Sequence, residues 1–183
     1  MTPEERRRAI VAATLPLVLE HGRAVTTAQI ASAAGVAEGT IFRVFTTKDD
    51  VVDAAIESAF DMEPYLQAIE QLDATGTLDQ VVTRTAQLMI DRFKQVFRMF
   101  SVLGIKGPAP NRHPEDWAER VAAAHERLLA PHADELTLTP REVMRYVRLL
   151  AFSGSNPHIT DGATLSAEQI ATLVLDGTRQ KAA

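Results

Sequence analysis

Apolar and polar residues alternate along this chain with the period of an α-helix, not with that of a β-strand. In successive segments the apolar side chains recur three or four residues apart, which places them on one face of a helix. Polar or Gly/Pro-containing stretches separate these segments. The segments are residues 4–21, 26–35, 38–45, 48–62, 64–72, 78–103, 115–130, 139–153 and 166–175. The pattern predicts an all-α protein of about nine helices.

Several predicted helices begin at a capping box, in which a hydroxyl residue is followed three positions later by an acid or amide. The pairs are Thr26 with Gln29, Thr47 with Asp50, Thr77 with Gln80, Thr139 with Glu142, and Ser166 with Gln169. The helix that follows Thr77 has an apolar side too broad for a surface helix, which predicts a central position. The sequence leaves open whether Leu78–Leu103 is one helix or two.

The stretch from Thr26 to Lys48 predicts two short helices joined by a tight turn. The capping box at Thr26 starts the first helix, and Gly35 ends it because the residue after a helix often needs a positive φ. The small side chain of Ala31 allows the helices to cross closely, and Ile41 fills the space between them. This arrangement is typical of a helix-turn-helix motif.

The second of these helices has two contrasting faces. Ile41, Val44 and Phe45 share one face, which we expect to be buried. The opposite face carries Glu38, Gly39, Thr40, Phe42 and Arg43. An outward phenylalanine beside a glycine suits a surface that another molecule approaches closely, such as the sugar or thymine methyl of DNA. An ordinary helical hairpin with one exposed aromatic residue is the alternative.

Four blocks of this region resemble the DNA-binding domain of TetR-type transcriptional regulators. They are residues 8–22, 26–31, 34–45 and 48–51, in the order and spacing of the family. The resemblance implies a three-helix helix-turn-helix DNA-binding domain over residues 1–50. It also implies a helical ligand-binding and dimerisation domain over residues 51–183. The chain departs from the family pattern at Ala37, Phe42 and Val44, where Ser, Tyr, and His or Tyr are frequent.

The resemblance and the exposed face together suggest which residues contact DNA. We expect Thr40 and Arg43 to face base edges, Phe42 to make an apolar contact, and Thr27 and Lys48 to reach phosphates. The full candidate set is Thr26, Thr27, Gln29, Glu38, Gly39, Thr40, Phe42, Arg43 and Lys48. The run Arg6–Arg8 lies either beside the DNA backbone or in solvent.

Charge and composition are compatible with this interpretation. The net charge of the 183-residue chain is −5, but residues 1–48 hold six Lys or Arg against four Asp or Glu. The end that we expect to face DNA is thus slightly positive on an acidic body, which helps to orient its approach to a polyanion. The chain has no cysteine and no long apolar run that could span a membrane, and a cytoplasmic location is expected.

The C-terminal segments contain large side chains that could line a ligand pocket. The candidates are Met89, Phe93, Phe97, Phe100, Trp117, His125 and Tyr146. Each of them singly is better explained by core packing. As a set they favour a mostly apolar ligand, with the Gly/Pro-rich segment 104–114 as its door. Arg141, Arg145 and Arg148 line one face of the helix over 139–153.

The last two predicted helices carry apolar stripes that suit a homodimer interface of four helices, as the family resemblance implies. The candidate interface residues are Val143, Val147, Leu150, Ile170, Leu173 and Val174. A two-fold dimer would read a palindromic operator in double-stranded DNA.

Catalysis and metal binding have no recognisable pattern in this sequence. The five histidines lack the spacing of a zinc helix, and there is neither a phosphate-binding glycine loop nor a nucleophile elbow. We therefore expect no cofactor, metal or catalytic residues. Two hypotheses remain: a dimeric repressor released from its operator by a small molecule, and a constitutive DNA-binding or protein-partner module. A cavity among the C-terminal helices would favour the first.

Overall fold

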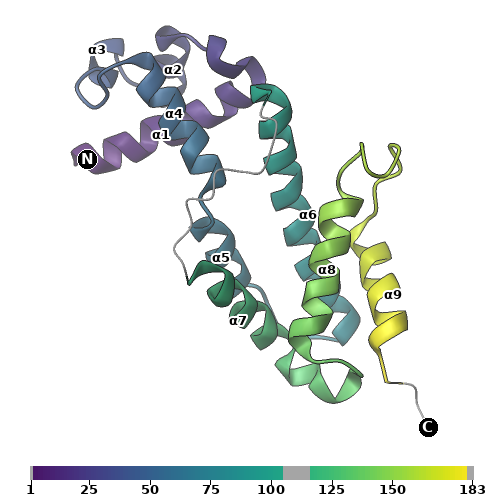
Figure 1. Ribbon diagram of the computed structural model, residues 1–183. Helices are drawn as coiled ribbons and strands as arrows, with labels where there is room; N and C mark the ends of the chain where they lie inside the picture. Colours follow the sequence, from purple (N-terminus) through teal and green to yellow (C-terminus); the bar gives the residue numbers. More distant parts are fainter. Residues whose placement is uncertain (1, 105–115, 181–183) are drawn as a thin grey trace. The chain divides into compact units, whose positions relative to one another are not determined.

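The structure of the protein is a computed structural model that describes residues 2–104 and 116–180. Within these residues the backbone is helical, with no β-strand and an isolated bridge between Leu136 and Arg179 (Figure 1). The α-helices are α1 (Pro3–His21), α2 (Thr27–Ala34), α3 (Glu38–Ile41), α4 (Lys48–Phe60), α5 (Glu63–Glu70), α6 (Leu78–Leu103), α7 (Trp117–Leu129), α8 (Pro140–Gly154) and α9 (Ala167–Thr178). Two 3-10 helices, η1 (Gly22–Ala24) and η2 (Ala130–Glu135), follow α1 and α7. The predicted all-α class is confirmed.

The chain folds as two compact units, each with its own apolar core. The first unit comprises Met1–Asp61 and Gln95–Asn111, and the second comprises Met62–Lys94 and Arg112–Ala183, in so far as these residues are described. The boundary expected at residue 50 falls inside α4, whose buried residues continue to Phe60. Because α4 packs along α1, its full length belongs with the helix-turn-helix.

The helix starts follow the capping boxes that the sequence predicts. Thr26, Thr47, Thr139 and Ser166 each accept a hydrogen bond from the backbone N–H three residues later, and the partner side chain bonds back to the cap. Thr77 and Gln80 exchange the same two bonds before α6. A further capping box, which was not predicted from the sequence, begins α1 and pairs Thr2 with Glu5. Each such cap stabilises a helix by ~1 kcal/mol.

The sequence left open whether residues 78–103 form one helix or two. In the structure they form α6, one continuous helix of 26 residues. Its residues contribute to both cores: Val81, Val82 and Met89 pack in the second unit, whereas Met99 is buried in the first. Pro16 lies inside α1 on an exposed position, as expected for a proline that a helix tolerates.

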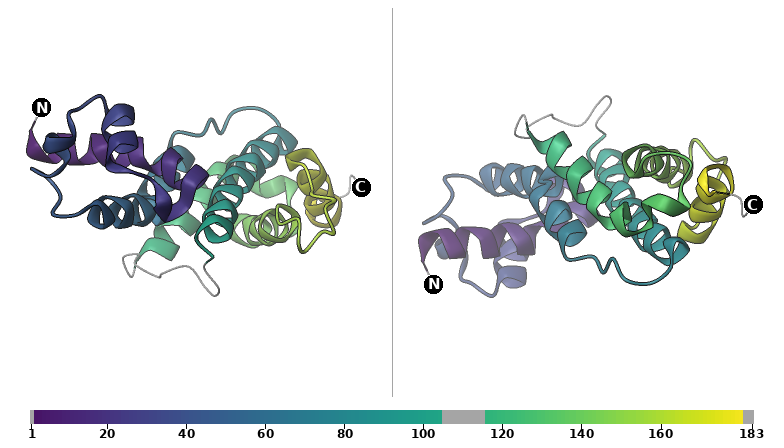
Figure 2. Two further views of the ribbon diagram at one scale, coloured as in Figure 1. Left: turned by 90° about the horizontal axis from the view of Figure 1, so that it is seen from above. Right: turned by 90° about the horizontal axis from the view of Figure 1, so that it is seen from below.

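In the second unit, α7 packs against α8, α8 against α9, and α5 against α7. Figures 1 and 2 show α8 alongside α9. The buried faces of these helices meet in one core, which includes Leu66, Val121, Leu128, Val143 and Ile170. None of the helices in the described ranges has the length and apolar character required to cross a membrane. The segment 104–114, expected to act as a door, lies outside the described residues except for Gly104.

Candidate DNA-binding surface and ligand cleft

The helix-turn-helix is built as its local sequence requires. Gly35 has φ 64° and ψ 32°, the left-handed conformation expected at the end of α2. The N–H of Val36 then bonds to the carbonyl of Ala31 and closes the turn. At the start of α3, Ala37 offers no side-chain cap. The departure at position 37 therefore leaves the first N–H groups of α3 without the hydroxyl acceptor that is frequent in the family.

The helix predicted over residues 38–45 is shorter in the structure, because α3 ends at Ile41. Residues 42–44 form a turn, although the N–H of Phe45 still bonds to the carbonyl of Ile41 at 2.9 Å. Gly39 and the β-branched residues Thr40, Ile41 and Val44 all have weak helix propensity, and the helix lacks a cap. Local propensity thus explains why the regular helix stops after one turn.

The two faces of this segment are arranged as the sequence predicts. Ile41 is fully buried and Phe45 nearly so, whereas Phe42 is 49% exposed and Arg43 is exposed. A Cβ added at Gly39 would meet no atom within 4 Å, so the backbone there faces open space. The turn therefore presents an exposed aromatic ring, an arginine and an accessible backbone on one side.

The two phosphate candidates already make contacts inside the protein. The Thr27 hydroxyl donates to the Glu38 carboxylate at 2.9 Å, which links α2 to α3. The Lys48 ammonium donates to the carbonyl of Arg23 at 3.0 Å, which links the start of α4 to η1. Thr26 and Gln29 are held in their capping box. These groups therefore position the motif, and Lys48 keeps donors to spare for a phosphate.

The arginine run of α1 is partly engaged as well. The Arg7 guanidinium lies 4.8 Å from the centre of the Phe45 ring, a cation–π contact between α1 and the segment after α3. Arg23 pairs with Asp53 at 2.6 Å. Arg7 and Arg23 thus help to hold the helices of the first unit together, and both side chains remain exposed at its surface.

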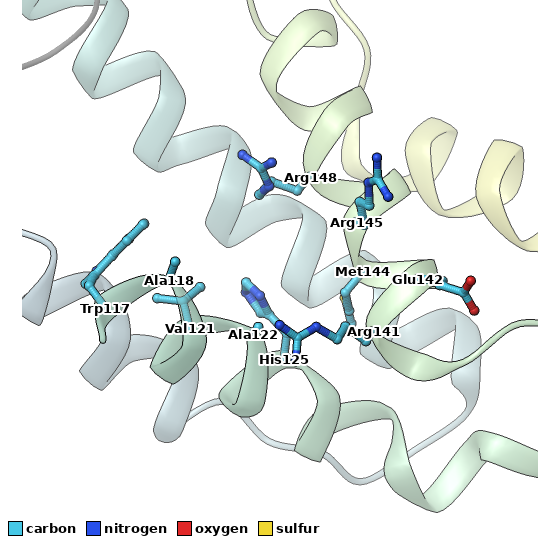
Figure 3. Close-up of a pocket in the computed structure, with 10 residues that line it drawn as sticks. All are labelled: Trp117, Ala118, Val121, Ala122, His125, Arg141, Glu142, Met144, Arg145 and Arg148. Carbon is cyan, nitrogen blue, oxygen red and sulfur yellow. The ribbon is translucent and has the colours of Figure 1, made fainter. Parts of the chain in front are cut away.

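The second unit contains a cleft of about 440 Å³ between α7 and α8. Figure 3 shows α7 side chains along one wall and α8 side chains along the other. The lining residues are Trp117, Ala118, Val121, Ala122, His125, Arg141, Glu142, Met144, Arg145 and Arg148. The volume falls within the range of ~300–1,000 Å³ that is typical of small-molecule sites.

Two of the seven candidate pocket residues, Trp117 and His125, line this cleft, and the other five lie elsewhere. Met89 is buried in the core of the second unit, and the Phe93 ring packs edge-on against Phe152 at 5.3 Å. Phe100 packs against Phe60 in the first unit, and Tyr146 is exposed on α8. Phe97 is half-buried on the part of α6 that belongs to the first unit. Helical spacing identifies apolar side chains but does not distinguish a core from a cleft wall.

His125, one of the residues that line the cleft, pairs with Tyr65, which lies outside the lining. His125 is 4% exposed, and its Nε2 lies 3.3 Å from the hydroxyl of Tyr65 on α5. Burial, helped by the positive charge of Arg148, lowers the pKa of His125 to about 4. Burial also raises the pKa of Tyr65 above its ordinary value. Both groups are therefore neutral at pH 7, and His125 offers the cleft hydrogen bonding without charge.

Acidification should destabilise the protein through His125. The unfolded chain takes up a proton below pH ~6.5, whereas the folded protein does so only near pH 4. Because the unfolded state binds more protons in this window, stability that is present above pH 6.5 is lost as the pH falls toward 4. Between pH 7 and 4.5 we expect His125 to account for a loss of about 2 kcal/mol in the free energy of unfolding.

Urea unfolding of the wild type and of His125→Gln at both pH values measures this contribution. Glutamine keeps a hydrogen-bonding side chain but does not titrate, so the variant should lose less stability on acidification. His158→Gln, which replaces an exposed histidine, is the control and should behave as wild type. If the free energy of unfolding depended equally on pH in the wild type and in His125→Gln, the loss of stability could not be attributed to His125.

The candidate dimer residues divide by burial. Val143, Val147, Ile170 and Val174 are buried within their own protomer, and Leu150 packs against the same core. Leu173 alone among the six is widely exposed, at 57%. The exposed apolar residues of α8 are Tyr146, Leu149 and Phe152, which the sequence reading did not select for an interface. The outer face of α8 and α9 thus carries Leu173 from the predicted set, together with three apolar residues of α8 that were not predicted there.

No group of three or more histidine, cysteine, aspartate or glutamate side chains within residues 2–104 and 116–180 could hold a metal ion. The absence of a cofactor and of catalytic residues stays a prediction.

Comparison with known proteins agrees with this geometry. Residues 10–55 match the model of bacterial regulatory proteins of the tetR family. A TetR-family transcriptional regulator from Mesorhizobium loti MAFF303099 shares the fold with a TM-score of 0.60 at 14% identity, over 98% of this chain and 100% of that chain. A tetR-family regulator from Streptomyces coelicolor gives 0.56 at 22% identity, over 96% and 80% of the two chains.

A third similar structure is the complex of SmeT with triclosan, with a TM-score of 0.54 at 16% identity, over 97% of this chain and 93% of that chain. SmeT is the repressor of the Stenotrophomonas maltophilia multidrug efflux pump SmeDEF. At these identities the similarity establishes the fold, whereas the match of residues 10–55 identifies the DNA-binding domain. Residues 10–55 thus match the tetR family of bacterial regulatory proteins, and the chain as a whole has the fold of TetR-family regulators.

Proposed function

We propose that this protein is a dimeric transcriptional repressor that binds a palindromic operator and leaves it when a small molecule occupies the second unit. The observation that carries the proposal is the exposed side of residues 38–43. There an aromatic ring, an arginine and an open glycine backbone face outward, whereas Ile41 and Phe45 on the opposite face are buried. Such a surface fits the major groove, where arginine reads guanine and an apolar ring contacts a thymine methyl.

The cleft between α7 and α8 supports ligand control. Its volume suits a small molecule, and it combines apolar walls with a few polar groups. SmeT, whose fold this chain shares, is a repressor that has been seen in complex with triclosan. A constitutive DNA-binding module, the alternative function, would have no need for such a cleft. Release from DNA requires that the ligand bind one state more tightly, and a 100-fold loss of affinity requires ~2.7 kcal/mol of coupling.

A homodimer is supported by the outer face of α8 and α9. Tyr146 and Leu149 lie three residues apart on α8, and Leu173 is exposed on α9. Exposed apolar side chains on adjacent helices favour association with a second copy of the chain. A two-fold dimer would place its two recognition segments on major grooves about 34–36 Å apart, and the operator would be a palindrome.

Substitutions in the DNA-facing segment test the proposal. Arg43→Ala should weaken operator binding by about 1–3 kcal/mol and reduce discrimination against operators with a changed base. Lys48→Ala should weaken binding to all DNA sequences similarly and flatten the dependence on salt. Operator DNA can be found by footprinting upstream of the protein's own gene, and affinities measured by fluorescence anisotropy at several salt concentrations.

Arg127→Ala is the matched control, because it removes the same charge from α7 in the second unit. Its operator affinity should equal that of wild type. Lys48 also bonds to the carbonyl of Arg23, so circular dichroism must show that Lys48→Ala remains folded. Wild-type operator affinity in both Arg43→Ala and Lys48→Ala would exclude this surface as the DNA-binding face.

A further inference from the structure

The arginines of α8 give the cleft an electrostatic character that its apolar walls do not reveal. Arg141, Arg145 and Arg148 follow one another at intervals of four and three residues, and all three line the cleft. All three side chains are exposed and can be solvated, so each is either held by an internal acidic partner or open to water and to a ligand that supplies negative charge. The contacts of each arginine distinguish these two cases.

Arg141 has an internal partner. Its two terminal nitrogens donate to the two carboxylate oxygens of Glu119 on α7, at 2.9 and 2.7 Å. Glu126 adds a weaker attraction to the same guanidinium. Arg141 therefore serves mainly to bridge α7 and α8, and its charge is neutralised without a ligand.

Arg145 and Arg148 have no such partner. Within the described residues neither makes a hydrogen bond or an ion pair within 4 Å. Arg148 extends from α8 into the space above α7, and the His125 ring points toward the same space (Figure 3). The charge of Arg148 acts on His125 in the cleft and on Tyr65 beside it, since it contributes to the lowered pKa of His125 and opposes the rise in the pKa of Tyr65.

The acidic residue that lines the cleft does not neutralise these arginines by contact. The Glu142 carboxylate accepts hydrogen bonds from the N–H and hydroxyl of Thr139 in the capping box of α8. It points away from α7 in Figure 3. Arg145 acts on Glu142 only through space, as a minor cause of its lowered pKa. The cleft therefore has positive charge that is available to an incoming group.

The remaining walls are apolar. Trp117, Val121 and Ala122 of α7 face Met144 of α8, with Val121 and Met144 buried. Methionine adapts to varied shapes, and the indole ring offers a broad apolar surface. An apolar body with a single charged head matches this distribution of side chains better than a wholly apolar or a highly charged molecule.

We propose that the effector is an amphipathic anion, with its apolar body against Trp117, Val121 and Met144 and its acidic head on Arg148 and Arg145. This inference rests on the proposed function and names the chemical class of its ligand. A carboxylate is the favoured head, because guanidinium groups bind its two oxygens through paired hydrogen bonds. The neutral His125 accommodates such a head without adding charge. This class keeps the mostly apolar body that the sequence predicts and adds an acidic head to it.

Direct binding tests the inference independently of DNA. Trp117 is the single tryptophan of the chain and lines the cleft, so its fluorescence reports occupancy. Decanoate, decan-1-ol and decylamine share one apolar chain but differ in head charge. Decanoate should bind at least ten-fold more tightly than decan-1-ol, and decylamine should bind most weakly. Titrations are made below the micelle concentration of each probe and repeated with decyl phosphate, which separates carboxylate from general anion recognition.

Variants identify the head-group site. Arg148→Gln and Arg145→Gln should each reduce decanoate affinity about ten-fold while leaving that of decan-1-ol within two-fold. Arg127→Gln removes an equal charge from α7 outside this cleft and should leave both affinities unchanged. Equal binding of decanoate and decan-1-ol, or unchanged decanoate affinity in both arginine variants, would overturn the assignment.

The two proposals fail in distinguishable ways. Decanoate that binds at Arg148 and does not release operator DNA leaves the ligand class intact but contradicts the repressor mechanism. Operator release by decan-1-ol and not by decanoate supports a ligand-controlled repressor but overturns the anionic class. Absence of any Trp117 response or calorimetric heat with all four probes overturns the anionic class as well.

Discussion

Replacing Leu149 and Leu173 with glutamate is expected to convert the protein into a monomer and to weaken operator binding by about 100-fold or more. Both side chains are widely exposed, on α8 and α9, so the substitutions should leave the fold of each protomer intact. In a homodimer each substitution would occur twice and bury like charges across the interface, which is strongly unfavourable. A monomer retains one DNA-binding segment and loses the effective concentration that links two half-sites.

Sedimentation gives the oligomeric state, and anisotropy with operator DNA gives the affinity. The double variant Gln67→Glu, Ala123→Glu is the control, since it adds the same two charges at exposed positions of α5 and α7. It should remain a dimer and bind the operator with nearly wild-type affinity. A Leu149→Glu, Leu173→Glu variant that stays dimeric would place the interface elsewhere. A monomeric variant with undiminished operator affinity would exclude a two-fold reading of the DNA.

The local elements of this fold could be predicted from the sequence, because short-range interactions determine them. A threonine or serine three residues before an acid or amide specifies its own hydrogen bonds, and the boxes at Thr26, Thr47, Thr77, Thr139 and Ser166 form as expected. Gly35 adopts its left-handed conformation for an equally local reason. The end of α3 was predicted four residues too late, because the apolar spacing of Ile41 and Phe45 persists through the turn that follows the helix.

Assignments that depend on packing were less predictable. Periodicity showed that Val143, Val147, Ile170 and Val174 share an apolar face, but an apolar face can meet its own protomer or a partner. In the structure these four residues are buried within their own protomer, whereas Leu149 and Leu173 are exposed. Leu149 is adjacent in sequence to Leu150, which packs against the core, and a rotation of one residue decides between the two.

The residues that line the cleft were difficult to predict from the sequence for the same reason. Phe93 and Phe100 are large apolar residues of α6, yet each packs against another ring, and they belong to different units. The useful signal was polar: Arg141, Arg145 and Arg148 recur at helical spacing, as the sequence already showed. A charged stripe alone is most often solvated. The stripe gains a functional meaning from the cleft beside it, and from Arg145 and Arg148, which make no hydrogen bond or ion pair with any residue of 2–104 or 116–180.

Substitutions at Ile41 and Phe42 should separate folding from DNA binding, because these adjacent residues lie on opposite faces of the helix-turn-helix. Ile41 is fully buried in the core of the first unit, so Ile41→Ala should lower its stability by about 2–5 kcal/mol through lost apolar contacts and a residual cavity. Phe42 is 49% exposed, and Phe42→Ala should change stability by no more than about 0.5 kcal/mol.

For operator affinity, the order of the effects at Ile41 and Phe42 should be the reverse of that for stability. Phe42→Ala removes the ring proposed to contact the groove, so operator affinity should fall while the protein remains folded. Ile41→Val, which deletes one methylene and is expected to cost about 0.5–1.5 kcal/mol, is the mild control and should bind the operator as wild type does. Denaturant unfolding followed by far-ultraviolet circular dichroism gives the stabilities, and anisotropy gives the affinities.

Because Ile41 has no exposed surface, any loss of operator binding in Ile41→Ala must act through folding and should recover at lower temperature or in a stabilising osmolyte. Undiminished operator affinity in Phe42→Ala would remove that ring from the DNA-binding surface.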